Sequence, residues 1–357
     1  MQLKLSASRL PFAPLLLIAP FFLWGTAMVA MKGVIPHTTP LFMAGVRLLP
    51  AGVLILIAAA LMGRPQPQGW AAWLWIALFG IVDGTLFQGF LAEGLVRTKA
   101  GLGSVMIDSQ PLAVALLSLW LFQEHIGLWG WLGLGLGVSG ISLIGLPDEW
   151  IFHVLGFGAN ITIGNWQQLF VSGEWLMLLA ALSMAVGTVL IRYVCKYADP
   201  VTATGWHMIL GGLPLWGLSS VVESQQWQNL VGTEWLALGY ATVFGSAIAY
   251  GLFFYFASSG SLTSLSSLTF LTPIFALLFG YFFLFEVLSP LQWVGVCLTL
   301  ISIYLINQRD KLSGESNKVA VSANTMTQQQ PVLESSPTQQ LNPLPIQVRE
   351  SETEILR

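Results

Sequence analysis

The sequence predicts an all-α integral membrane protein. Of its 357 residues, 55% are hydrophobic and only 9% are Asp, Glu, Lys or Arg, whereas soluble proteins carry about 25% charged residues. The charges are also uneven, because residues 308–357 hold 11 of the 31 and residues 14–307 hold only 18. The apolar runs are continuous and lack the alternation of a barrel strand, which indicates helices.

Ten apolar windows have the length of a membrane-spanning helix, which needs roughly 20 residues. They are bounded by charged residues, proline or turn residues. The first follows Lys4 and Arg9 as a signal peptide would, but it is long and is followed directly by further spans, so we expect a retained helix. The windows cover residues 14–34, 38–62, 70–92, 98–121, 127–146, 174–195, 200–222, 233–257, 262–285 and 289–307.

Basic residues in the short loops predict the orientation. With a cytoplasmic N-terminus, that side collects seven of them and the opposite side three, so we expect both termini in the cytoplasm and a plasma or inner membrane location. The two sets are Lys4, Arg9, Arg64, Arg192, Lys196, Arg309 and Lys311 against Lys32, Arg97 and Lys99.

Two segments lie outside the ten windows. The connection 147–173 has no Lys or Arg and several aromatic residues, so we expect it outside the cell, along the membrane interface. Residues 308–357 are rich in Gln, Ser, Pro and Glu, a composition that cannot bury enough apolar surface to fold. We therefore expect a disordered cytoplasmic tail.

Charge and cysteine content exclude other classes. The net charge of −3 and the lack of a basic cluster argue against nucleic acid as a partner. Cys195 and Cys297 are too few for a disulfide framework, and neither has metal-ligand spacing with His or Asp. We expect no metal and no cofactor.

The chain contains an internal duplication. An offset of 162 residues aligns the third to fifth windows with the eighth to tenth, and an offset of 160 aligns the second with the seventh. Each copy has five helices, so the second must cross the membrane in the opposite sense, and inverted repeats are typical of secondary transporters. We expect repeats at 14–146 and 174–307. Matching pairs include Trp73 with Trp235, Pro111 with Pro273, Glu124 with Glu286, Trp131 with Trp293, Gly45 with Gly205, and Gly52 with Gly212.

The repeats resemble a known family. Each has a proline in its fourth helix, a glutamate thirteen residues later, and a Trp-Leu/Val-Gly motif in its fifth, at 131–133 and 293–295. With Trp24-Gly25-Thr26 and Lys32 in the first helix, this is similar to the EamA-type repeats of the drug/metabolite transporter superfamily, over residues 14–307. The resemblance implies ten helices, cytoplasmic termini, and passage of amino acids, related metabolites or drugs through the lipid bilayer. It does not fix the substrate.

Three ionisable residues fall deep within the predicted spans, where charge is costly and marks candidate functional positions. Arg47, Asp83 and Asp108 lie in one layer roughly 13–15 Å below the outer surface, at 1.5 Å per residue. Two carboxylates opposite one arginine leave surplus negative charge, which suits a cationic substrate group or a proton. The alternative is a buried pair of Arg47 with one aspartate. Arg47 aligns with His207, and we predict that all four residues line a central cavity.

Other polar and proline residues share these helices. Ser104, Asp108 and Pro111 lie on one face of the fourth helix. Pro111 and Pro273 should each free a backbone carbonyl, and paired proline-interrupted helices favour a transport site. Packing kinks and closely packed hydroxyl-rich helices are the alternatives. Further candidates for the pathway are Ser266, Trp24 and Gln88.

Helix-end residues suggest gates and contacts. Glu124 and Glu286 are candidate gate residues, although solvated helix ends commonly carry such acids. The glycine-rich fifth helix contains Gly133-x-x-x-Gly137, which permits close packing within the chain or a homodimer.

Two other function classes compete with transport. Gly137-Val138-Ser139-Gly140 has the form used by intramembrane serine proteases, with His207 two helices further on. The motif is weak, because Gly and Ser are common packing residues in membrane helices. A non-transporting membrane sensor would use the tail as its output. The duplication favours a transporter and not an enzyme.

Overall fold

The computed structural model describes residues 13–122, 127–146, 151, 172–253, 268–269 and 271–312. Within these residues the regular structure is helical and contains no strand. They fall in a unit that extends to Ser313, and residues 314–357 form a second unit that lies outside the described residues. Most of the 147–173 connection and of the predicted tail therefore stays a prediction.

The first repeat contains five helical stretches, of which the third and the fourth are irregular. The third stretch is continuous but has a π-helical segment in its middle, and the fourth is broken in two. The elements are α1 (Ala13–Val34), the short η2 (Ile35–His37), α2 (Pro40–Leu61), α3 (Gly69–Phe79), η3 (Gly80–Leu86), α4 (Phe87–Arg97), α5 (Ala100–Ile107), α6 (Gln110–Phe122) and α7 (Leu128–Gly145).

The second repeat follows the same plan as far as it is described. Its π-helical segment again lies within its third stretch. The elements are α10 (Gly173–Val194), α11 (Pro200–Val222), α12 (Gly232–Tyr240), η4 (Ala241–Ile248), α15 (Leu271–Leu284) and α16 (Pro290–Leu312). The helix α16 extends five residues past its predicted end, into the polar sequence after residue 307.

Seven helical stretches in the described part are long and apolar enough to cross a membrane, and α7 and α15 are shorter apolar helices. This confirms a multi-span helical membrane protein. The number of ten crossings stays a prediction.

Helix starts follow local sequence rules. Pro40 and Pro200 stand at the first position of α2 and α11, where a missing N–H costs nothing and φ is already helical. Asp199 caps α11, since its carboxylate accepts from the backbone N–H groups of Val201 and Thr202 at 2.9 and 3.2 Å. Equivalent sequence signals therefore begin equivalent helices in the two repeats.

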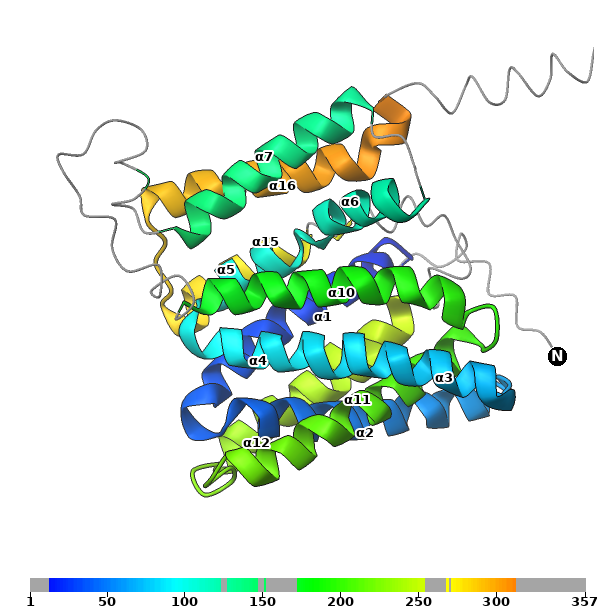
Figure 1. Cartoon of the computed structure of the whole chain (residues 1–357). Coiled ribbons are helices and arrows are strands. Elements are labelled where there is room, and N and C mark those ends of the chain that lie inside the picture. Colours follow the sequence, from blue (N-terminus) through cyan, green and yellow to red (C-terminus); the bar gives the residue numbers. More distant parts are fainter. Residues whose placement is uncertain are drawn as a thin grey trace, which may run out of the picture. The chain divides into compact units, whose positions relative to one another are not determined.

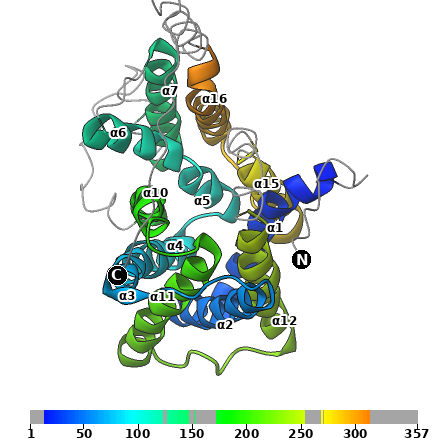
Figure 2. The same cartoon turned by 90° about the vertical axis from the view of Figure 1, so that its right-hand side faces the viewer.

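The central pair α2 and α11 runs antiparallel, which is direct evidence that the repeats are inverted. A β-carbon on Gly45 would lie 2.9 Å from Trp216, near the end of α11, and one on Gly52 would lie 2.7 Å from the carbonyl oxygen of Gly205, near its start. Glycines matched by the 160-residue offset thus allow the two backbones to approach closely. Figure 2 shows α2 and α11 beside each other.

The remaining contacts come in related pairs. Helix α1 packs against α15 and against α12 with η4, while its counterpart α10 packs against α5 with α6 and against α3, η3 and α4. The fifth helices of the two repeats, α7 and α16, pair with each other (Figure 1). Exchange of the two repeats therefore reproduces the packing scheme.

The glycine-rich face of α7 is used within the chain. A β-carbon on Gly140 would lie 2.7 Å from the carbonyl oxygen of Gly295, and one on Gly133 would lie 2.8 Å from Ile306. Ser302 donates a hydrogen bond of 2.6 Å to the carbonyl oxygen of Gly133. Of the two alternatives for this face, close packing within the chain is the one observed, because α16 covers Gly133 and Gly140. A homodimer stays a prediction.

In the described part of the chain, a turn lies next to the proline of each fourth helix. Residues Asp108 and Ser109 form a turn between α5 and α6, and Pro111 lies in the first turn of α6. In the second repeat α15 begins at Leu271, so that Pro273 lies in its first turn. Proline cannot donate to the preceding turn, which accounts for the break in the first repeat. Residues 254–267 and 270 lie outside the described residues, so a matching break in the second repeat stays a prediction.

Candidate functional site

Arg47 lies in the middle of α2 and reaches the other repeat. Its side chain is 5% exposed. One terminal nitrogen donates a hydrogen bond of 2.7 Å to the hydroxyl of Ser246 in η4, and the other donates to the side-chain oxygen of Gln88 in α4. Its Nε has no hydrogen-bond partner in the described part of the chain. A buried cation is thus held by two uncharged groups.

An aromatic cluster adjoins this arginine. Gln88 also forms a hydrogen bond with the hydroxyl of Tyr250. This hydroxyl interacts electrostatically with both Arg47 and Asp83. The ring of Trp24 in α1 packs on Tyr250 and on Phe253, with centroid distances of 5.2 and 5.3 Å. The indole Nε1 of Trp24 is buried and has no partner among the described residues.

His207 of α11 and Asp83 of η3 form a second buried group. Nε2 of His207 lies 3.3 Å from Oδ2 of Asp83, and His207 is 2% exposed. The imidazole also packs on the ring of Phe79, with centroids 4.3 Å apart. Nδ1 of His207 has no partner within the described residues. The buried imidazole and carboxylate thus form a contact between the two repeats.

Glycines bring these two side chains together. A β-carbon on Gly84 of η3 would lie 2.7 Å from Cα of Gly211 and 2.9 Å from the carbonyl oxygen of His207. The hydroxyl of Thr85 donates to the carbonyl oxygen of Gly211 at 3.0 Å. On the opposite side, a β-carbon on Gly187 of α10 would lie 2.5 Å from Oδ1 of Asp83. Asp83 therefore fits a space that only glycine leaves open.

The two groups are related by the duplication. Arg47 and His207 occupy equivalent positions, and each reaches the π-helical segment of the opposite repeat. Gln88 and Tyr250, which contact each other, are also equivalent under the 162-residue offset. The buried groups that we predicted to meet therefore lie in two separate sets, one around Arg47 and one formed by His207 and Asp83. Among the described residues neither aspartate forms an ion pair with Arg47 within 4.0 Å.

The other predicted residues of the fourth helix lie at its break. Asp108 is half-buried and accepts a hydrogen bond of 3.2 Å from the hydroxyl of Ser104 on the same helix. Next to Pro111, the side chain of Gln110 donates to the hydroxyl of Thr188 in α10. Pro273 is buried, and Ser266 lies outside the described residues. Whether these residues line a cavity stays a prediction.

Glu286 links the two repeats at the end of the bundle where α1 ends and α2 begins, which we call the Lys32 end. Its carboxylate accepts from the backbone N–H groups of Ala100 and Gly101 at 2.6 and 3.2 Å, and so caps α5. Lys32 itself donates to the carbonyl oxygen of Leu95 at 2.7 Å. The other candidate gate, Glu124, lies outside the described residues.

Two further acids tie the repeats together at the Lys32 end. Glu223, just after α11, accepts from the backbone N–H groups of Leu41 and Phe42 at 2.9 and 3.0 Å. Glu174 of α10 accepts from the hydroxyl of Thr98 at 2.7 Å. Glu286 and Glu223 of the second repeat thus hold helix starts of the first, where the backbone N–H groups favour negative charge, and Glu174 bonds the segment between α4 and α5.

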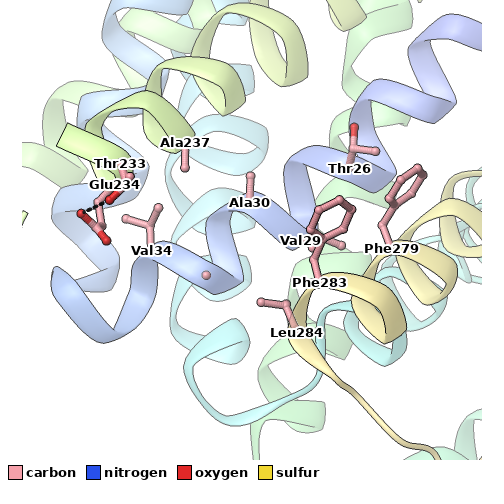
Figure 3. Close-up of a pocket in the computed structure, with 11 residues that line it drawn as sticks. Thr26, Val29, Ala30, Val34, Thr233, Glu234, Ala237, Phe279, Phe283 and Leu284 are labelled. Carbon is pink, nitrogen blue, oxygen red and sulfur yellow. Dashed lines mark hydrogen bonds between the residues drawn. The ribbon is translucent and has the colours of Figure 1, made fainter. Parts of the chain in front are cut away.

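A pocket of about 430 Å³ lies between α1, α12 and α15. Figure 3 shows its mainly apolar lining, with Glu234 and Thr233 at one end and Thr26 at the other. The hydroxyl of Thr26 lies 2.6 Å from that of Tyr240. The lining includes none of the predicted site residues, although Thr26 is two positions from Trp24.

The protease alternative is not favoured. The hydroxyl of Ser139 donates to the carbonyl oxygen of Gly135 on its own helix at 2.9 Å, and Ser139 is exposed. His207 is buried against Asp83 instead. In the described part, no group of three or more His, Cys, Asp or Glu side chains is placed to hold a metal ion.

Comparison with known proteins identifies the family. The model of the EamA-like transporter family matches residues 11–146 and 171–308. The chain belongs to this family. It is 66% identical over 301 residues to an uncharacterised transporter of Synechocystis sp., covering 84% of this chain and 90% of that protein. It is 55% identical over 295 residues to a chloroplastic WAT1-related protein of Arabidopsis thaliana, covering 82% and 68%.

A solved structure supports the same fold. A crystal structure with 18% sequence identity superimposes with a TM-score of 0.56, covering 82% of this chain and 94% of that chain. The resemblance to EamA-type repeats is therefore confirmed, and the protein is a multi-span membrane protein of a transporter family.

Sequence reasoning missed Ser246, Gly187 and the two π-helical segments of this EamA-like protein. The 162-residue offset already aligned Ser246 with Gly84, and Gly80 and Gly84 stand one turn apart in the third helix. What the sequence lacked was a signal for which face of each helix meets the other repeat. That choice depends on the close backbone approach at Gly84 and Gly211.

Proposed function

We propose that this EamA-like protein is a secondary transporter that carries a small organic solute by alternating access. The observation that carries the proposal is the inverted packing of α2 and α11, with the other helix contacts in related pairs. Two related halves of opposite orientation can exchange conformations and so open a central site to either side. The break before Pro111 adds an interrupted helix of the kind that such sites use, and Pro273 stands at the matching position of the second repeat.

We further propose that the Lys32 end is one gate. Glu286, Glu223 and Glu174 each bond a helix end of the opposite repeat, so these contacts must break if the repeats separate there. With the predicted cytoplasmic termini, this end faces outward. Glu286 is the proposed gate residue, because it joins α5 to the segment after α15.

The buried pair of Asp83 and His207 supports coupling to protons. Both groups can bind a proton, and the pair lies between η3 and α11, which belong to different repeats. A change of charge at the pair would alter the contact between the repeats, which is the contact that alternating access must rearrange.

The solute is expected to be an amino acid, a related metabolite or a drug, and the membrane to be the plasma or inner membrane. The names of the relatives quoted above state no substrate. The sensor alternative predicts that removal of residues 313–357 abolishes function, whereas a transporter should keep its solute flux without them.

The test is a screen of solute uptake by the full-length protein in proteoliposomes, with and without a pH gradient. We expect uptake of at least one solute class above that of empty vesicles, and a faster rate with the proton gradient. Absence of flux for every solute would contradict transport. Flux that ignores the gradient would remove only the proton coupling. Ser139→Ala serves as a matched control and should leave the flux unchanged.

A further inference from the structure

We propose that Arg47 binds a carboxylate of the solute, and that the preferred substrates of this protein are organic acids or zwitterions with an aromatic or apolar body. This inference rests on the proposed transport function. It differs from the sequence-based expectation, in which surplus negative charge favoured a cationic group.

Arg47 has no counter-ion among the described residues. Arg47 is 5% exposed, and its observed partners, Ser246 and Gln88, are uncharged. The ion pairs of the described chain join His37 with Glu234, Arg64 with Asp199, and His207 with Asp83. Arginine stays protonated in proteins, and a buried charge is costly unless it is paired. A bound carboxylate would supply the negative charge that the described partners of Arg47 lack.

Arg47 also has one N–H donor that is not used within the described residues. Nε of Arg47 is buried and has no partner among the described residues. A guanidinium presents its N–H groups as a planar fork that matches the two oxygens of a carboxylate. In the described part no second cation contacts Arg47, so a singly charged carboxylate fits better than a phosphate, which commonly needs more positive charge.

Aromatic side chains lie next to Arg47. Gln88 bonds both Arg47 and Tyr250, and the ring of Tyr250 packs on Trp24. The indole Nε1 of Trp24 is a second buried donor without a partner in the described residues. This surface offers contacts for an aromatic or apolar body and one more donor for an acceptor atom.

The two aspartates of the site already have partners, so they attract a cationic solute less strongly than Arg47 attracts a carboxylate. Asp83 is engaged with His207, and Asp108 accepts from Ser104. The pocket between α1, α12 and α15 does not include Arg47. The structure therefore has the arginine closed off, and a solute would reach it when the repeats rearrange.

The test compares three probes of equal shape, namely 3-phenylpropanoate, 3-phenylpropanamide and 3-phenylpropylamine. Binding to the purified full-length protein is measured by calorimetry. We expect the carboxylate to bind about tenfold tighter than the amide or the amine, the range of a charge-assisted hydrogen bond. Arg47→Gln should reduce carboxylate binding to the level of the amide, and Arg47→Lys should fall between them.

Arg64→Gln is the matched control, since Arg64 lies just after the same helix and is paired with Asp199. It should keep the preference for the carboxylate. Equal binding of the three probes, no binding of the carboxylate, a preference for the amine, or an unchanged preference in Arg47→Gln would each overturn the proposal.

Thermal unfolding of the solute-free protein gives an independent readout. If Arg47 waits for a carboxylate, Arg47→Gln should unfold at the same or a higher temperature, because an unpaired buried charge is removed. A clearly lower unfolding temperature would mean that Arg47 is structural and would overturn the proposal. Flux of neutral or cationic solutes alone would overturn this inference while leaving the transport function intact.

Discussion

Arg47 and His207 occupy equivalent positions in two inverted repeats, yet their surroundings differ. Arg47 carries a permanent charge and contacts the uncharged Ser246 and Gln88. His207 carries a titratable charge and contacts Asp83. Both reach across to the π-helical segment of the opposite repeat. We propose that the two sites diverged in function while the duplication kept their geometry, with solute binding at the first site and proton binding at the second.

The largest expected effect follows from Asp83→Asn, which removes the acid of the titratable site without changing its size. Transport should fall at least about tenfold and should lose its dependence on pH, because the pair can no longer exchange a proton with the same charge balance. Uptake rates across a pH series measure both effects. A variant with normal pH dependence would show that the two sites do not divide the tasks in this way.

Asp108→Asn should have a smaller effect. Asp108 lies at the break between α5 and α6, and its described partner is Ser104 on the same helix. We expect a several-fold lower uptake rate with the pH dependence retained, since the Asp83 and His207 pair remains. If Asp108→Asn instead abolished the pH dependence, proton binding would have to be reassigned to the helix break.

Gly187→Ala tests the titratable site without altering its charges. The added methyl group would lie 2.5 Å from Oδ1 of Asp83, so the carboxylate must shift. The pH profile of uptake should change, with a rate loss of a few fold.

The matched variant is Gly25→Ala at the related glycine of α1. There the methyl group would lie 2.7 Å from the backbone oxygen of Thr272, which is packing and not a site. Gly25→Ala should lower the unfolding temperature, at a cost of about 1–3 kcal/mol for overpacking, and leave the pH profile unchanged. Identical profiles for the two variants would contradict a special role for Asp83.

The smallest effect is expected at the Lys32 end, away from both sites. Glu286→Gln keeps a hydrogen-bond acceptor but removes the charge that caps α5, which should cost about 1 kcal/mol of stability. Thermal unfolding and uptake rates measure it, and Asp199→Asn, which weakens the cap of α11, is the matched comparison. If Glu286 is a gate, its variant should change uptake more than Asp199→Asn does at equal stability. Equal uptake in both variants would make Glu286 a simple cap.

The sequence determined the class of the protein and its internal symmetry. Continuous apolar windows are sufficient evidence of membrane helices, because no polar backbone can stay unpaired in lipid. The 162-residue offset predicted two five-helix repeats, and the odd helix number predicted their inversion. Pro111 marked the broken fourth helix of the first repeat, since proline cannot donate the backbone hydrogen bond of a helix interior. Proline alone is not a sufficient signal, because Pro50 lies inside the unbroken α2.

Only the tertiary structure decided which buried groups meet. The sequence placed Arg47, Asp83 and Asp108 in one layer but gave no information on the rotation of each helix about its axis. The close backbone contact of Gly84 with Gly211 fixes that rotation, and the space left at Gly187 admits the side chain of Asp83 next to His207. Arg47 is left with uncharged partners as a result. Depth in the membrane is a property of position along the chain, whereas pairing depends on packing between segments distant in sequence.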